Sequence, residues 1–169
     1  MLDTTLLQNT PTTLSAMLKN LPEHIINSNE GGESWSPYDI IGHLIHGEKT
    51  DWIPRAQIIL SDQEDKRFIP FDRFAQFQNS QGKNINQLLA EFTSLRQSNI
   101  TILNSWNLTP EDYIKTGIHP EFGEVNLKQL ISCWVAHDLG HIYQISRVIA
   151  SQYKEDVGPW VKYLRVLQE

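Results

Sequence analysis

Two histidines stand four residues apart in the segment CWVAHDLGHIYQI, residues 133–145. In an α-helix, residues at positions i and i+4 lie on the same face, so His137 and His141 would bring their rings together. On a helical wheel both fall on the stripe that carries Leu130 and Trp134, and they therefore face inward. Adjacent buried imidazoles repel each other when charged, whereas a divalent cation binds them in the neutral form.

The pair by itself leaves two interpretations open. The histidines are either metal ligands or core residues that hydrogen-bond to backbone and side-chain groups. The H-x-x-x-H spacing lacks the glutamate of H-E-x-x-H, which argues against a zinc protease. Because two ligands make a weak site, a metal centre requires a third ligand from elsewhere in the chain.

The segment DIIGHLIHGE, residues 39–48, offers that third ligand. The helical wheel places His43 at the edge of the apolar arc and turns His46 about 60° further toward solvent. We therefore expect His43 to be the third ligand and His46 to be a surface residue. Glu48 falls inside the arc, on the same side as Arg55. It is expected either to make a buried contact with an arginine or tyrosine, or to orient a ligand histidine or a water.

Three other side chains are candidates for the same site. Cys133 lies one turn before His137 and is expected to be a small buried residue, with a role as fourth ligand as the alternative. His119, in the segment IHPEFGE, is expected at the mouth of a pocket. His24 lies in a polar connection and is expected on the surface.

The elements that must position these side chains are helices. Apolar residues recur at helical spacing in four long stretches, and no convincing strand pattern is present. The four stretches are residues 3–20, 37–60, 84–105 and 126–151. Ser36 and Asp39 form a capping-box pattern at the start of the second stretch, and Pro54 is expected either to kink it or to weaken one backbone hydrogen bond. This pattern predicts an all-α protein, a four-helix bundle.

The connections between these helices also carry information. Residues 61–83 form a long connection that is aromatic as well as polar, and we expect it to be packed and either functional or to hold a short helix. Residues 115–125 are expected to form a loop, and the tail VGPWVKYLRVLQ predicts one more short helix. We expect residues 1–169 to form a single domain.

Composition limits the class of function. The net charge of −6 disfavours nucleic-acid binding, because phosphates would meet net repulsion. No run of about 18 apolar residues is present, so we expect no membrane span, and the N-terminus has no secretory signal pattern. A single cysteine cannot form an internal disulfide and fits a cytoplasmic location. We therefore expect a small-molecule substrate.

Two stretches together resemble the DinB/YfiT-like superfamily. They are WSPYDIIGHLIHGEKTDWIPR and, far downstream, HPEFGEVNLKQLISCWVAHDLGHIYQI, and the resemblance covers about residues 30–150. It implies a four-helix bundle in which His43, His137 and His141 hold one divalent metal ion. The superfamily includes thiol S-transferases that use a low-molecular-weight thiol such as bacillithiol or mycothiol as co-substrate, and many other members have no established activity. Homodimers are common in that superfamily, and apolar residues of the first helix and the C-terminal tail would form the face.

The sequence is compatible with three hypotheses about the function of the histidines. In the first, three protein ligands leave positions open on zinc, nickel, iron or manganese, and the protein is a thiol S-transferase or a hydrolase. Its pocket would lie between the second and fourth helices, under the connections 61–83 and 115–125. In the second, the metal stabilises a non-catalytic stress-response or binding protein of the same fold. In the third, no metal binds and the histidines are core residues.

Overall fold

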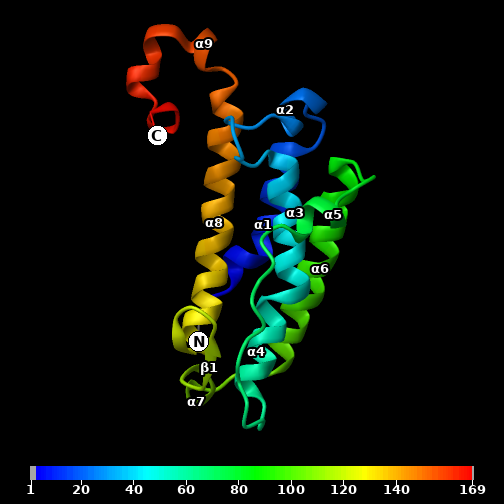
Figure 1. The fold of residues 1–169 in the computed structure, drawn as a ribbon, viewed down its shortest axis with the longest axis vertical. Coiled ribbons are helices and arrows are strands. Elements are labelled where there is room, and N and C mark those ends of the chain that lie inside the picture. The colour runs from blue at the N-terminus through cyan, green and yellow to red at the C-terminus, as the bar shows by residue number, and fades with distance from the viewer. Residues whose placement is uncertain (1–2, 169) are drawn as a thin grey trace.

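Four long helical elements form the bundle that the sequence predicted (Figure 1). They are α1 (Thr5–Leu18), α3 (Pro37–Thr50) continued by α4 (Trp52–Leu60), α6 (Ile85–Ser105) and α8 (Leu127–Ser151). Helices α1 and α3 each pack against both α6 and α8, so α1 and α3 lie diagonally across the bundle. The computed structural model describes residues 3–168; Met1, Leu2 and Glu169, which the single-domain expectation includes, lie outside it.

Capping boxes set the first residue of three long helices. The Ser36 hydroxyl accepts a hydrogen bond from the backbone N–H of Asp39, and the Asp39 carboxylate accepts one from the backbone N–H of Ser36. The same reciprocal pair begins α6 at Asn84 and α8 at Asn126. These bonds satisfy backbone donors that have no partner within the helix, which fixes where the histidine-bearing helices start.

The second predicted helix is broken rather than kinked. The expected single helix over 37–60 ends at Thr50, passes through Asp51 and restarts at Trp52. Pro54 has no N–H to donate to the carbonyl of Thr50, and its ring crowds that carbonyl, so the break falls just before the proline. The break aims the side chains of Asp51 and Trp52 into the same cavity as His43.

A short hairpin occupies the segment that was expected to be a loop. Strand β1 (Thr116–His119) pairs antiparallel with β2 (Gly123–Asn126), and His119 stands opposite Gly123. Gly123 has a φ of +71°, a conformation that suits glycine at the end of a three-residue hairpin turn. Each strand has only four residues, too few for an alternating pattern to stand out in the sequence.

The connection 61–83 is packed and holds a short helix, as predicted. Its residue Phe68 donates a backbone hydrogen bond to Ile118 of β1, with an N–O distance of 2.9 Å. Further along, α5 (Ala75–Asn79) packs against α3 at Gly42, where an added Cβ would lie 2.4 Å from the Ser80 hydroxyl oxygen. The connection is thus held to the hairpin at one end and to α3 at the other.

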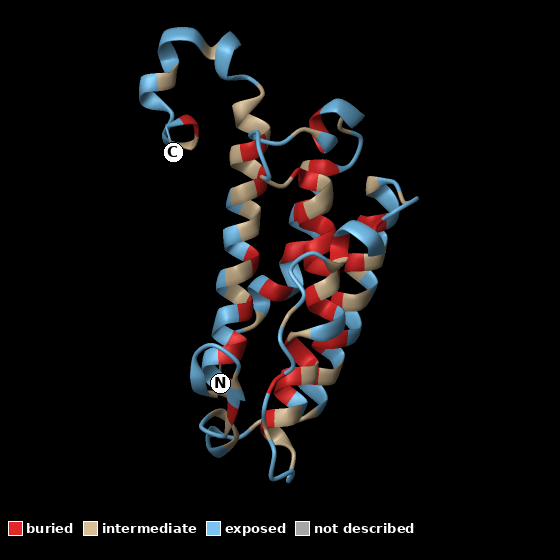
Figure 2. Ribbon diagram, viewed as in Figure 1, coloured by how far each residue is buried: buried red, intermediate tan, exposed pale blue. Residues whose placement is uncertain are grey.

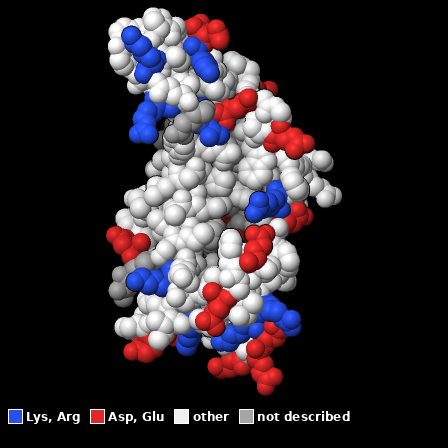
Figure 3. Space-filling view, turned by 60° about the vertical axis from the view of Figure 1, so that its left-hand side comes forward, with Lys and Arg blue, Asp and Glu red and all other residues white. Residues whose placement is uncertain are grey.

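The remaining elements are short. They are α2 (Glu23–Asn27), α7 (Pro110–Tyr113), α9 (Lys154–Val157) and the 3-10 helices η1 (Gly158–Tyr163) and η2 (Arg165–Leu167). The last three form the C-terminal segment that extends from the end of α8 in Figure 1, where the sequence predicted a single short helix. No helix among residues 3–168 is long and apolar enough to cross a membrane. On the face shown in Figure 3, acidic and basic side chains lie interspersed, and no region there is purely basic.

A polar layer divides the apolar core into two clusters. One cluster joins α4 to the first turns of α8, and the other joins α3 to the first half of α6 and the later turns of α8. Between them each long helix contributes buried polar residues, and Figure 2 shows the buried positions on the inner sides of the helices. The buried residues of this layer are Thr10, Glu48, Arg96, Asn99 and Asp138. The site described next lies beside this layer.

Candidate metal centre

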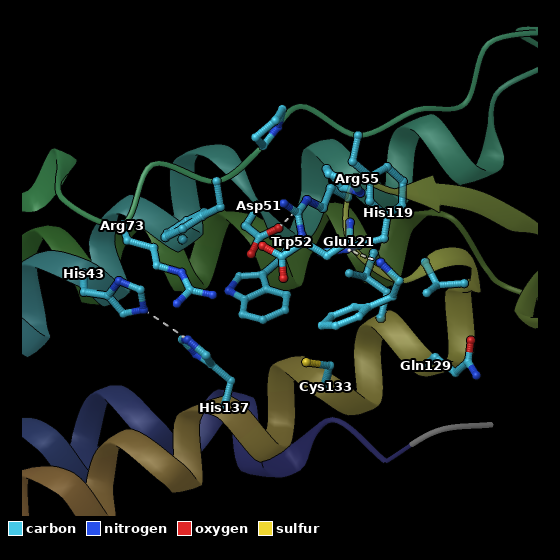
Figure 4. A pocket seen from close by; sticks show the side chains of 18 of the residues that line it. His43, Asp51, Trp52, Arg55, Arg73, His119, Glu121, Gln129, Cys133 and His137 are labelled. Carbon is cyan, nitrogen blue, oxygen red and sulfur yellow. Dashed lines mark hydrogen bonds and ion pairs between the residues drawn. The ribbon is translucent and has the colours of Figure 1, made fainter.

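Three histidines from two helices converge at the level of the polar layer. His43 comes from α3, and His137 and His141 come from successive turns of α8. The Nε2 atom of His137 lies 3.2 Å from that of His43 and 3.1 Å from that of His141. Figure 4 shows His43 and His137 pointing toward each other across the end of a cavity. The structure therefore brings together the three residues that were predicted as ligands, with one nitrogen from each within 4.8 Å of the others.

The spacing of the nitrogens suits a shared cation. Two nitrogens bound to one zinc ion at about 2.0–2.1 Å in a tetrahedral site stand about 3.3 Å apart. The separations of 3.2 and 3.1 Å are close to that value. A neutral ring nitrogen carries either one proton or one lone pair, so three that face each other cannot all be satisfied by hydrogen bonds among themselves. A cation that accepts all three lone pairs removes that conflict.

The histidines are held in the neutral form that a cation requires. Burial lowers the pKa of His43 to about 3, with smaller contributions from His141, His46 and Arg73. Burial also lowers the pKa of His137 to about 3, followed by the effect of His141 and His43. The pKa of His141 is lowered by burial and raised in part by its hydrogen bond to Gln144. At neutral pH all three rings therefore offer lone pairs.

One of the three rings is oriented by a hydrogen bond, and the other two are held by aromatic contacts. Nδ1 of His141 lies 2.8 Å from Oε1 of Gln144, which selects the tautomer whose Nε2 lone pair faces the cluster. The Nδ1 atoms of His43 and His137 are buried and have no hydrogen-bond partner in the described part of the chain. Their rings are packed by Trp35, 4.8 Å from His43 between centroids, and by Trp52, 5.1 Å from His137.

A cavity of about 600 Å³ opens beside the histidines. It lies between α3–α4 and α8, under the connection 61–83 and the hairpin, as the sequence analysis expected. Most of its wall is apolar, and the apolar side chains that line it include Trp35, Trp52, Phe68, Phe71, Phe122, Val125 and Leu130. Its size falls in the usual range for small-molecule sites.

One ion pair crosses the middle of the cavity wall. Arg55 Nε lies 2.6 Å from Asp51 Oδ1, and both side chains are largely buried. Arg55 also donates to the backbone carbonyl of Ile69 at 3.3 Å. Burial raises the pKa of Asp51, and the Arg55 charge opposes that rise.

Glu48 lies behind the histidines and not in the cavity. Its carboxylate accepts hydrogen bonds from Arg96 at 2.8 Å and from Asn99 at 2.9 Å. The indole N–H of Trp134 also donates to it, at 3.2 Å. Burial raises the pKa of Glu48, and the bonds from Arg96 and Asn99 oppose the rise. The buried arginine contact was anticipated, but its partner is Arg96 of α6 rather than Arg55, and no hydrogen bond joins Glu48 to the three histidines.

The other residues that the sequence marked as candidates lie outside the three-histidine group. His46 is partly exposed and packs against Phe71, with ring centroids 4.8 Å apart. Cys133 is exposed to the cavity, which corrects the expectation of a buried residue, and it is not part of the three-histidine group. His119 stacks on Phe122 at 4.4 Å and lines the cavity. His24 is exposed, as expected.

Several residues that build the site were not predicted from the sequence. Arg96 and Asn99 stand at helical spacing within the apolar stripe of α6, a signal that could have marked them as buried. Asp138 follows a predicted ligand directly, yet it points to the polar layer, where it binds Arg96. Arg73 lies in the long connection, where no periodicity indicates which way a side chain points.

Comparison with known proteins agrees with this description. A family model described as the DinB superfamily matches residues 6–145. Among solved structures, the chain is similar to YfiT from Bacillus subtilis, described as a probable metal-dependent hydrolase with an unusual four-helix bundle topology. That match has a TM-score of 0.73 and 17% sequence identity, and covers 89% of this chain and 85% of that one. None of the curated proteins matches this chain. The predicted fold is thereby confirmed.

Proposed function

The chain belongs to the DinB superfamily, and from that premise we propose that it is a metal-dependent hydrolase acting on a small molecule. The observation that carries the proposal is the convergence of three neutral imidazoles on the wall of a cavity of about 600 Å³. The description of YfiT as a probable metal-dependent hydrolase supports the same reaction class.

The ligand set favours a catalytic site over a structural one. Structural zinc sites are closed by four protein ligands, whereas catalytic sites keep a position free for water or substrate. The described residues supply three ligands, His43, His137 and His141, and the cavity lies on their open side. A divalent ion held there would act as a Lewis acid toward the substrate and would activate water.

The protein's own residues keep the ligands in place. Gln144 holds the tautomer of His141, and Trp35 and Trp52 pack against the rings of His43 and His137. The apolar wall limits the number of waters near the reacting bond, which strengthens electrostatic interactions in the site. Substrate orientation then depends on the few polar groups of the cavity.

The first test is metal content, followed by hydrolysis. Tag-free protein, reloaded separately with zinc, nickel, iron and manganese, is analysed by elemental mass spectrometry beside a His137→Ala, His141→Ala double variant. We expect about one ion per chain in the wild type and almost none in the variant, because two of three ligands are gone. A His24→Ala, His46→Ala variant serves as control, since neither side chain belongs to the three-histidine group, and it should bind like the wild type.

Hydrolysis of nitrophenyl esters and amides by the loaded protein then tests the reaction. Turnover that requires both the metal and the histidines supports a hydrolase. Turnover that appears only with a low-molecular-weight thiol would instead indicate a thiol S-transferase using the same cavity. A bound metal that raises the melting temperature without any turnover would indicate the non-catalytic alternative, and absence of metal in every preparation would overturn the proposal.

A further inference from the structure

Among residues 3–168, the cavity lining includes a cationic side chain, Arg73, that has no hydrogen-bond or ion-pair partner. Four of its lining residues carry formal charge: Asp51, Arg55, Arg73 and Glu121. Arg55 is neutralised by Asp51 at 2.6 Å and also donates to a backbone carbonyl. Within residues 3–168, the Arg73 guanidinium forms no hydrogen bond or ion pair. Its neighbour Asp72 is turned to its own backbone, where it accepts from the N–H of Phe74 at 2.9 Å.

Arg73 reaches into the cavity beside the histidines. It belongs to the connection between α4 and α5, and Figure 4 shows its side chain extending toward the space between His43 and Trp52. The Arg73 charge is also one of the causes that lower the pKa of His43. The guanidinium and the candidate metal ligands therefore border the same space.

The cavity lining carries two acidic and two basic side chains, and neither acid, Asp51 or Glu121, is hydrogen-bonded or ion-paired to Arg73 in the described structure. The buried carboxylates behind the histidines, Glu48 and Asp138, are both bound to Arg96 and cannot turn toward Arg73. Arg73 is exposed and lines the cavity, and a divalent ion at the histidines would add a second positive charge that repels its guanidinium. A bound anion near both groups would remove that repulsion.

The chemistry of the wall narrows the class of anion. A guanidinium presents parallel N–H donors that match the two oxygens of a carboxylate. The rest of the cavity is mostly aromatic and aliphatic, with Trp52, Phe68 and Phe71 among the residues that would surround the body of a ligand. Such a wall suits an apolar, flat molecule better than a sugar or a polyphosphate.

We infer that the substrate of this site is a small organic carboxylate with an apolar, aromatic body, and that Arg73 binds its carboxylate group. The inference rests on the proposed function for the reaction, but the binding step can be tested without it. In the proposed hydrolase, Arg73 holds the carboxylate while another part of the substrate faces the histidines. Arg73 is then a specificity residue for the substrate's charge.

The test compares phenylacetate with phenylacetamide, a neutral molecule of nearly the same shape. Binding to zinc-loaded and to metal-free protein is followed by calorimetry and by the fluorescence of Trp35 and Trp52, which line the cavity. We expect phenylacetate to bind about tenfold tighter than phenylacetamide or better, because a charge-assisted pair of hydrogen bonds is lost in the amide. Arg73→Gln should abolish this preference and leave the affinity for phenylacetamide unchanged.

Two further variants sharpen the result. Arg73→Lys keeps the charge but loses the paired donors, so an intermediate preference is expected. Arg67→Gln is the matched control, because Arg67 is exposed, pairs with Asp65 at 2.8 Å and does not line this cavity. It should behave like the wild type.

The metal-free protein separates this inference from the proposed function. A carboxylate preference that depends on Arg73 in the metal-free protein supports the inference even if no hydrolysis is ever found. A preference that survives in Arg73→Gln, or one that appears only with zinc, would show that the metal holds the carboxylate and would overturn it. So would tighter binding of phenylphosphate than of phenylacetate, or equal binding of acid and amide.

Discussion

Two polar clusters lie side by side in this bundle, and they differ in how completely their groups are satisfied. In the first, the polar layer, Arg96 joins Glu48 to Asp138, and Thr10 and Asn99 supply further hydrogen bonds. In the second, three histidines point lone pairs or protons at one another, and two of their Nδ1 atoms have no partner in the described structure. Both clusters use helices α3 and α8.

The difference separates a structural role from a ligand-binding one. Each carboxylate of the polar layer has partners within the protein, and the Arg96 guanidinium lies 4.9 Å from the ring of Phe92 and 4.9 Å from that of Trp134. One buried atom of the layer, Arg96 Nε, has no hydrogen-bond partner among the described residues, but both carboxylates are satisfied without a ligand. In the proposed function, a cation completes the histidine cluster. Since His137 and Asp138 are adjacent in the chain, one turn of α8 contributes to both clusters.

The largest expected effect follows from breaking the polar layer. Arg96→Met leaves the carboxylates of Glu48 and Asp138 buried without their cation, and removing one partner of a buried ion pair costs about 3–5 kcal/mol. The free energy of unfolding, measured in urea with metal-free protein, should fall by that amount. Arg67→Met removes an exposed pair with Asp65 that solvent screens, and it should leave the free energy of unfolding almost unchanged.

Equal losses in the two arginine variants would contradict this account, because it assigns stability to the buried pair only. In the histidine cluster, we expect substitutions to change metal binding and not the folding of the metal-free protein. A His137→Ala, His141→Ala variant should lose metal binding while its metal-free form stays folded.

An effect of intermediate size on the free energy of unfolding is expected when the pH is lowered. In metal-free protein His43 and His137 have a pKa of about 3, against 6.5 for an ordinary histidine. Between these values the unfolded chain binds more protons than the folded one, so the free energy of unfolding decreases as the pH falls from about 6.5 toward 3. The loss should be on the order of a few kcal/mol by about pH 4.5, and the contribution should be constant above pH 7.

The pH series needs a variant, because other groups titrate too. The raised pKa of Glu48 acts in the opposite direction, since a carboxyl that is more easily protonated in the folded state gains stability in acid. His43→Leu removes one histidine and should flatten the curve between about pH 6.5 and 4.5, while His24→Leu, at an exposed position, should not. Identical curves for His43→Leu and the wild type would show that this histidine is not held neutral by burial.

The smallest expected effect comes from the helix that carries both clusters. Gly140 lies inside α8 between two predicted ligands, and a Cβ at that position would meet nothing within 4 Å. Gly140→Ala should therefore stabilise the protein by about 0.5–1 kcal/mol through helix propensity, without changing the metal content. At Gly42, where the Ser80 hydroxyl lies 2.4 Å from the added Cβ, the same change should destabilise it. Thermal unfolding of both variants tests the contrast, and a loss of metal from Gly140→Ala would contradict it.

The sequence by itself determined the local part of this protein. The 3.6-residue period located the four long helices, and the wheel put His137, His141 and His43 on inward faces because side-chain direction along a helix depends only on position. The capping box at Ser36 was readable for the same reason, since its partners are three residues apart. The ordered set of short motifs added the family.

Tertiary structure alone decided which groups meet across the bundle. The pairing of Glu48 with Arg96 and of Arg96 with Asp138 depends on contacts between residues 48 and 42 positions apart. The entry of Arg73 into the cavity depends on the path of a non-repeating connection. A periodic pattern gives the face of a helix but not the residue opposite it, and an irregular segment has no period at all. The open side of the three histidines, and hence the proposed chemistry, became visible only once the helices were packed.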